Sequence, residues 1–158
     1  MGVRVQALVV REGHILMAKV SQEGQEWWCL PGGGWEGGID QPGGETQAEG
    51  ALRELQEECC VQGALVRQTS RWTEADGKET VTFLVEIGKQ QPRLGVDPEA
   101  VQAGVPQALV DVRFLRLDEI TERDRAFLWA AGLLGVGEYW KLVESWGDEV
   151  SYPNRSDL

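Results

Sequence analysis

The pattern of apolar and polar positions divides the chain into strands and helices that alternate. Apolar residues dominate 3–10 and return at 15–20 after a turn at Glu12-Gly13, which predicts two strands paired with each other. Further strands are predicted at 27–30, 64–72, 79–87 and 110–117. The Asp76-Gly77 turn is expected to join the strands at 64–72 and 79–87 into a hairpin. This order of elements indicates an α/β protein.

Residues 46–59 follow the helical period instead. Thr46 is followed three residues later by Glu49, the spacing of a capping box that starts a helix. Gly50 inside this helix costs roughly 1 kcal/mol relative to alanine. The predicted buried stripe consists of Ala48, Ala51, Leu52 and Leu55.

The C-terminal part is predicted to be helical. One helix begins at Thr121, and a short one is expected around 138–146, before a polar tail at 154–158 that we expect to be frayed. At 158 residues, without internal repeats or a low-complexity linker, the chain is expected to form one domain over residues 1–158.

The charge limits the partners of the chain. A formal net charge of −11 with no basic patch argues against nucleic-acid polymers and anionic membranes. No apolar run approaches the roughly 20 residues that span a bilayer, and the N-terminus lacks a signal-peptide layout. We therefore expect a cytoplasmic protein, with its three cysteines reduced.

The most informative cluster lies in the helix at 46–59. Glu54, Glu57 and Glu58 stand at i, i+3 and i+4 and share one face, where three like charges repel. A hard divalent cation such as Mg²⁺ takes oxygen ligands and would remove this repulsion. Arg53, four residues before Glu57, is placed to orient a carboxylate. A solvated acidic face is the alternative, but the glycine-rich loop expected at 30–36 favours a site.

These residues resemble the signature of the Nudix hydrolases, G-x5-E-x7-R-E-U-x-E-E-x-G-U with U aliphatic. Glu45, seven intervening residues and then the run from Arg53 to Val61 match it. Cys60 replaces the glycine near the end, so the helix is expected to end differently. Eleven residues rather than five separate Gly33 from Glu45, which we interpret as an insertion at 37–42.

The resemblance implies an α/β/α sandwich with a mixed β-sheet and metal-assisted hydrolysis of a nucleoside diphosphate linked to another group. Mg²⁺, or Mn²⁺, would neutralise the phosphoryl oxygens while water attacks phosphorus. The implied metal ligands are Glu57, Glu58, Glu54 and the carbonyl of Gly32. Glu54 is alternatively the general base, Arg53 would hold Glu57 or Glu45, and Glu45 would support the helix start.

Residues outside the signature are expected to complete the site. Glu99, in the long segment 88–109, is the candidate for an additional acid, with a plain surface loop as the alternative. Trp35 and Trp72 are the candidates among seven tryptophans for stacking on a base, although packing is the commoner use. The insertion at 37–42 is either a lid or an inert bulge.

Three functions stay open at this point. The leading one is a pyrophosphohydrolase acting on a small nucleotide, either a nucleoside triphosphate or an ADP-ribose-like compound. The second is a Nudix-fold module that senses a nucleotide without cleaving it, and the third is a Nudix isomerase acting on a prenyl diphosphate. Whether the protein forms a homodimer is left open too.

Overall fold

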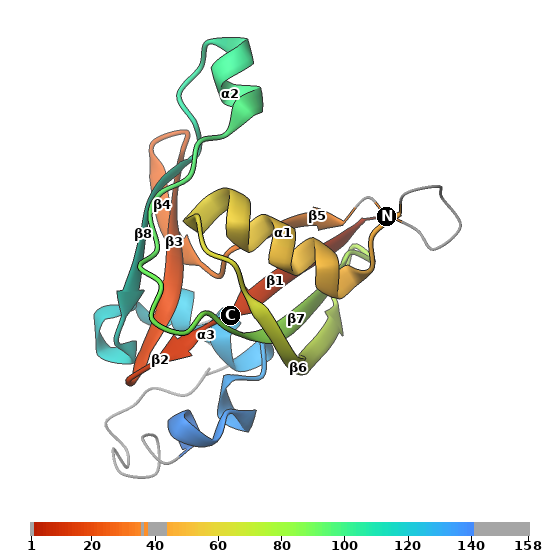
Figure 1. The fold of residues 1–158 in the computed structure, drawn as a ribbon, viewed down its shortest axis with the longest axis vertical. Helices are drawn as coiled ribbons and strands as arrows, with labels where there is room; N and C mark the ends of the chain where they lie inside the picture. The colour runs from red at the N-terminus through yellow and green to blue at the C-terminus, as the bar shows by residue number, and fades with distance from the viewer. Residues whose placement is uncertain (1, 36, 38–43, 141–158) are drawn as a thin grey trace.

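The structure is a computed structural model that describes residues 2–35, 37 and 44–140. Its elements in chain order are β1 (Val3–Leu8), β2 (Val10–Arg11), β3 (His14–Gln22), β4 (Gln25–Cys29), β5 (Gly32–Trp35), α1 (Gln47–Cys59), β6 (Ala64–Thr73), β7 (Glu79–Glu86), α2 (Pro98–Ala103), β8 (Leu109–Leu115) and α3 (Glu122–Ala130) (Figure 1). Residues 137–140 are helical. The rest of the predicted helix at 138–146, the tail at 154–158 and most of the insertion at 37–42 lie outside the described residues.

The strands form two sheets. The first has the order β5-β1-β7-β6 and is mixed, because β1 and β7 run parallel while its other pairs are antiparallel. In the second, β3 lies between β4 and β8 and also pairs with β2. The predicted α/β fold with a mixed sheet is thus confirmed, as is the hairpin of β6 and β7.

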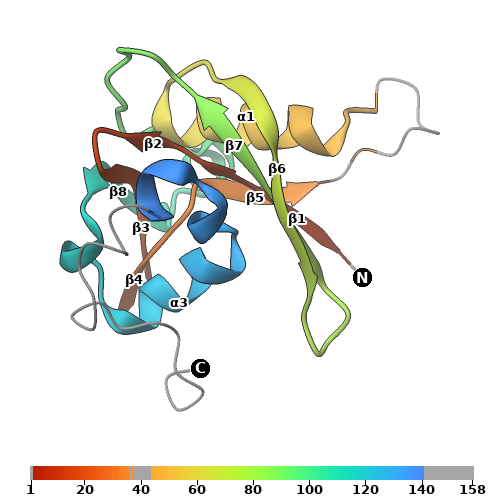
Figure 2. The same cartoon turned by 90° about the horizontal axis from the view of Figure 1, so that it is seen from below.

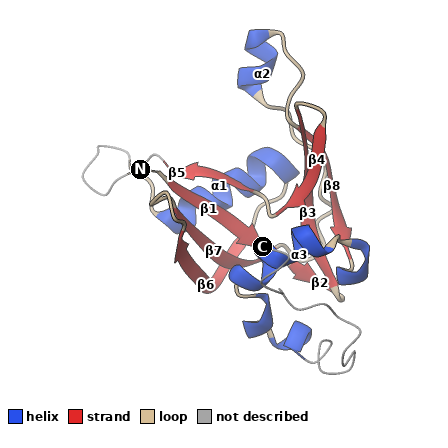
Figure 3. Ribbon diagram, turned by 180° about the vertical axis from the view of Figure 1, so that it is seen from behind, coloured by secondary structure: helices blue, strands red, loops and turns tan. Residues whose placement is uncertain are grey.

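Helices cover both sides of the strands, α1 on one side and α3 on the other (Figures 2 and 3). Buried residues of α1, including Ala51 and Leu55, pack with residues of both sheets in one core. Leu128 of α3 belongs to a second core on the opposite side. Among the described residues, no helix has the length and apolar character that crossing a membrane requires.

The predicted pairing of the first two strands is wrong for most of its length. β1 pairs with β5 and β7, and only the short strand β2 pairs with the start of β3. The chain passes from one sheet to the other at Val9, which lies between the end of β1 at Leu8 and the start of β2 at Val10. The turn at Glu12-Gly13 therefore closes a hairpin that is much shorter than the apolar run suggested.

The glycine-rich segment is a strand rather than the predicted loop. Gly32–Trp35 pairs antiparallel with β1, with Gln6 opposite Gly32 and Val3 opposite Trp35. A Cβ atom on Gly32 would lie 2.3 Å from the carbonyl oxygen of Val5, so only glycine permits this approach. The glycines serve to bring a bare strand close to its neighbours.

Helix α1 begins and ends through local backbone chemistry. The predicted capping box is present, since the amide of Glu49 donates to the Thr46 hydroxyl and the Thr46 amide donates to the Glu49 carboxylate. Cys60 takes the left-handed conformation, with φ 58°, and its amide donates to the carbonyl of Gln56. The expectation of a different helix end is therefore wrong, because the cysteine adopts the conformation typical of the glycine that it replaces.

Replacing Cys60 with glycine is expected to raise the free energy of unfolding by roughly 0.5–1 kcal/mol, because a left-handed conformation strains any residue with a Cβ. The thiol is exposed, so little packing is lost. Urea denaturation of the wild type, Cys60→Gly and Cys60→Ala measures the effect. Cys60→Ala keeps the strain and should show no such gain, whereas a destabilised Cys60→Gly would contradict this explanation.

Candidate active site

A cavity of about 880 Å³ lies between α1, strand β5 and the segment that leads into α2. Its wall is strongly acidic for a cavity, and half of its acidic side chains come from α1. The acidic residues that line it are Glu45, Glu54, Glu57, Glu58, Asp97 and Glu99. The structure thus brings together the signature carboxylates and the additional acid that were expected from the sequence to share a site.

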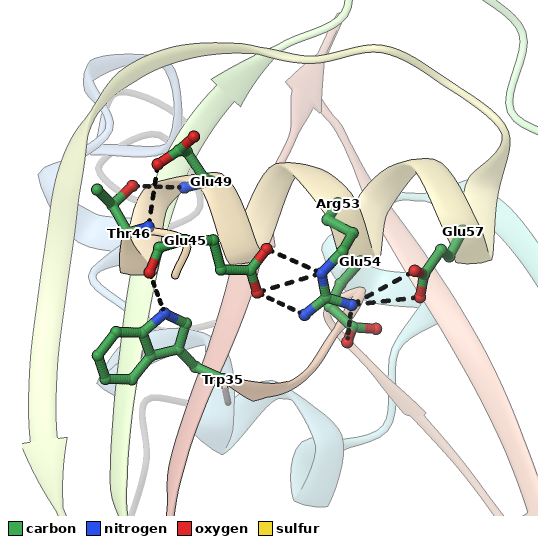
Figure 4. A network of polar contacts seen from close by, with 7 residues as sticks. All are labelled: Trp35, Glu45, Thr46, Glu49, Arg53, Glu54 and Glu57. Carbon is green, nitrogen blue, oxygen red and sulfur yellow. Dashed lines mark hydrogen bonds and ion pairs between the residues drawn. The ribbon is translucent and has the colours of Figure 1, made fainter. Parts of the chain in front are cut away.

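Arg53 connects three of these carboxylates (Figure 4). Its Nε donates to both carboxylate oxygens of Glu45 at 3.0 and 3.2 Å, and its Nη2 lies 2.8 Å from Glu45 Oε1. Its Nη1 donates to Glu54 at 3.0 Å and to Glu57 at 3.4 Å. These contacts raise the pKa of Arg53, with the hydrogen bonds that it donates to Glu45 as the largest cause. The arginine therefore stays charged and fixes Glu45 and Glu54.

Glu54 and Glu58 form a close carboxyl pair at the bottom of the site. Burial, as the largest cause, together with the neighbouring charge of Glu54 and its side-chain hydrogen bond, raises the pKa of Glu58 to about 8. The amide of Gly32 donates to Glu58 Oε1 at 3.2 Å, which opposes the shift. In the protein without a metal, one proton thus relieves the repulsion between the pair.

The donor set fits a divalent cation. All the candidate ligand atoms are oxygens, which suits Mg²⁺ or Mn²⁺, and a cation held by Glu54 and Glu58 would relieve the repulsion between them. Within the described part of the chain, however, no three His, Cys, Asp or Glu side chains converge closely enough to hold a metal as they stand. Glu57 is 55% exposed and only 3.4 Å contacts tie it to Arg53, so its side chain has room to rotate toward the pair.

The strand β5 passes directly beneath this pair. A Cβ atom on Gly33 would lie 2.6 Å from the carboxylate of Glu54, whereas one on Gly34 would meet nothing within 4 Å. Glu54 thus occupies the space that the missing side chain of Gly33 leaves. The predicted role of the Gly32 carbonyl as a metal ligand stays a prediction, since the observed contact of Gly32 with the site is its amide.

The segment leading into α2 closes the cavity beside the end of α1. The amide of Gly95 donates to the carbonyl of Glu58 at 2.8 Å, and a Cβ atom there would overlap the Glu57 carbonyl at 1.8 Å. Sequence reasoning missed Gln107, whose side chain donates to the carbonyls of Gly95 and Leu109 and accepts from the amide of Asp97. A single glutamine in an irregular segment carries no pattern that would have revealed this role.

The two candidate tryptophans lie elsewhere. The indole of Trp35 donates to the carbonyl of Glu45 at 2.9 Å and packs against the core beneath α1. Trp72 packs against the core on the opposite side, and neither ring is among the described residues of the cavity wall. The structure gives both rings packing contacts, and their predicted role in stacking on a base has no support from their positions.

The thiols are in the expected state. All three cysteines are free. Burial raises the pKa of Cys29, which lines the cavity, to about 11 and that of Cys59 to about 12. Both are therefore protonated and poorly nucleophilic at neutral pH.

The carboxyl pair makes the stability of the metal-free protein depend on pH. Because folding raises the pKa of Glu58 from 4.5 to about 8, its folded form favours the proton, and stability is lost as the pH rises through this range. The expected contribution is roughly 2–4 kcal/mol. Urea denaturation in a chelator at pH 5 and pH 9 measures it.

Glu58→Gln separates this contribution from those of the other carboxylates. The variant should gain stability relative to the wild type between pH 5 and pH 9, and added Mg²⁺ should reduce the difference by stabilising the wild type. An equal pH dependence in both proteins would show that Glu58 is not the group responsible.

Comparison with known proteins identifies the family and the fold of the chain. The family model described as NUDIX domain matches residues 1–134. A NUDIX hydrolase structure from Nitrosomonas europaea is similar at 19% identity and a TM-score of 0.60, where the match covers 78% of this chain and 61% of that one. An ADP-ribose pyrophosphatase from Streptococcus suis is similar at 18% identity and a TM-score of 0.54, over 74% of this chain and 75% of that one.

A further similar structure is the NUDIX domain of Shewanella oneidensis NrtR complexed with ADP ribose, at 17% identity and a TM-score of 0.55, over 89% of this chain and 87% of that one. No curated relative matches the chain. At these identities the solved structures establish the fold alone, whereas the family model spans most of the sequence. This chain belongs to the Nudix family.

Proposed function

We propose that the protein is a divalent-metal-dependent pyrophosphohydrolase that cleaves a nucleoside diphosphate linked to another group. The observation that supports this most is the half-buried pair of Glu54 and Glu58 beside the glycine strand β5, where burial and the neighbouring charge raise the pKa of Glu58 to about 8. Such a pair is unfavourable for folding, and a strongly perturbed carboxyl group in a cleft is typical of a functional site. The rest of the cavity supplies the carboxylates that the reaction requires.

Each acidic residue has a distinct place in this proposal. Glu57 and Glu58 hold the cation, with Glu54 as a further ligand or as the base that takes the proton of the attacking water. The bound cation would neutralise the charge on the phosphoryl oxygens. Arg53 holds the carboxylates in register through its contacts with Glu45 and Glu54. Glu99 also lines the cavity and would serve as the additional acid.

A small nucleotide such as ADP-ribose or a nucleoside triphosphate is the proposed substrate. Two of the similar structures are an ADP-ribose pyrophosphatase and a domain bound to ADP ribose. A cavity of about 880 Å³ is large enough for a ligand of this size. The negative charge of the protein does not oppose binding, because the cation supplies the countercharge locally.

Product analysis by mass spectrometry tests the proposal. The wild type is incubated with ADP-ribose, deoxynucleoside triphosphates and their oxidised forms, dinucleoside polyphosphates and NADH, with Mg²⁺ present and then chelated. Release of a nucleoside monophosphate that requires the metal is the expected result and identifies the leaving group. Binding of one compound without cleavage of any would favour a nucleotide sensor instead.

A further inference from the structure

Arg4 of β1 is a cationic side chain in the wall of this acidic cavity. Alternate residues of a strand point to opposite faces, and Val5 packs in the core beneath α1. Arg4 therefore leaves β1 on the other face, on the side of Gln6. Its guanidinium reaches the cavity beside the carbonyl of Leu30, where β4 ends and β5 begins.

The guanidinium is held in place from behind. Its Nε donates to the side-chain oxygen of Gln6 at 3.3 Å, and its Nη2 donates to the carbonyl of Leu30 at 3.1 Å. Gln6 is itself buried and donates to the hydroxyl of Thr82 at 2.9 Å. A chain of buried polar groups thus fixes the direction of Arg4 before any ligand binds.

No ion pair within the described part of the chain neutralises the charge of Arg4. The described residues of the cavity wall include two cations, and the other, Arg53, is occupied by Glu45, Glu54 and Glu57. Arg4 forms no ion pair with a carboxylate in the described part of the chain, and its Nη1 has no hydrogen-bond partner there. It lines the same cavity as Glu54 and Glu58, so it acts within the proposed site.

We propose that Arg4 binds a phosphate of the substrate and positions it against the cation held by α1. This inference rests on the proposed function, since it assigns the second positive charge to the same site. A guanidinium presents five N–H donors in a planar fork that matches phosphate oxygens. In Arg4, Nε and Nη2 each already donate one hydrogen bond within the protein, and these bonds orient the group. A purely structural arginine would be indifferent to the charge of the ligand.

Equilibrium binding of inorganic pyrophosphate in the presence of Mg²⁺, measured by calorimetry, tests the inference without turnover of a nucleotide. Arg4→Met should weaken pyrophosphate binding at least tenfold. Arg4→Gln keeps a donor for the Leu30 carbonyl and should weaken binding to the same extent, so it replaces the methionine variant if that variant does not fold. Arg4→Lys keeps the charge but loses the fork, so an intermediate loss is expected. Arg67→Met is the matched control, because Arg67 also donates from a strand to a carbonyl, that of Gly135, outside the cavity.

Steady-state kinetics on the nucleotide identified above separates positioning from general damage. The KM of Arg4→Gln should rise at least tenfold, with a smaller change in kcat, while Arg67→Met keeps both values. Unchanged pyrophosphate binding in the neutral variants, or no binding by the wild type, would overturn the inference. A wild type that binds pyrophosphate through Arg4 but cleaves no nucleotide would instead defeat the hydrolase and leave the anion site standing.

Discussion

Replacing Glu58 with glutamine is expected to abolish turnover while leaving the fold intact. The substitution removes a proposed metal ligand at nearly constant volume. Activity should fall a hundredfold or more, which exceeds the ~10–100-fold loss that is typical when a residue that only supports a metal ligand is replaced. The metal-free wild type already favours the protonated form of Glu58, because burial and Glu54 raise its pKa to about 8. Glutamine imitates that neutral form, so thermal unfolding in a chelator should show equal or greater stability.

The combination of effects is what makes this variant informative. A core carboxylate that merely supports packing would lose stability and activity together. Glu86→Gln makes the same substitution at an exposed position on β7 and should alter neither property. Retained activity in Glu58→Gln would defeat the assignment of the metal site to α1.

Adding one methyl group to Gly33 is expected to reduce activity at least tenfold. A Cβ atom there would lie 2.6 Å from the Glu54 carboxylate, so the end of that side chain must move. Since a flexible glutamate end yields more easily than backbone, stability should change by less than about 1 kcal/mol while the carboxyl pair is pulled apart. Kinetics and urea denaturation of Gly33→Ala measure both effects.

Gly34→Ala provides a matched control on the adjacent residue of the same strand. A Cβ atom at Gly34 meets nothing within 4 Å, so this variant should keep the activity of the wild type. If both alanine variants lost activity equally, the strand itself would be sensitive, and the specific contact between Gly33 and Glu54 would not explain the effect.

Helix α1 and its acidic face were predictable because they depend on local rules. The capping box of Thr46 and Glu49 and the spacing of Glu54, Glu57 and Glu58 each involve residues within a few positions of one another. Arg53 was predicted to hold Glu57 or Glu45, and the structure shows it contacting both. The signature thus carried most of the information about the site.

The features that sequence reasoning missed depend on partners far away in the chain. The glycine run reads as a loop until β1 supplies its hydrogen bonds, and β1 itself pairs with β7 across more than 70 residues. Arg4 and Gln107 reach the cavity only through this arrangement. Cys60 differs in kind, since its left-handed conformation is strained and a glycine would be the usual choice.

The most direct test of the central claim is a titration of Mn²⁺ followed by electron paramagnetic resonance, which reports free ion and gives the number of bound ions. We expect the wild type to bind Mn²⁺ in competition with Mg²⁺, and we expect Glu58→Gln to lose this binding while Glu86→Gln retains it. Identical binding by all three proteins would mean that the ion is attracted only by the general negative charge, and the carboxylates of α1 would not be a metal site.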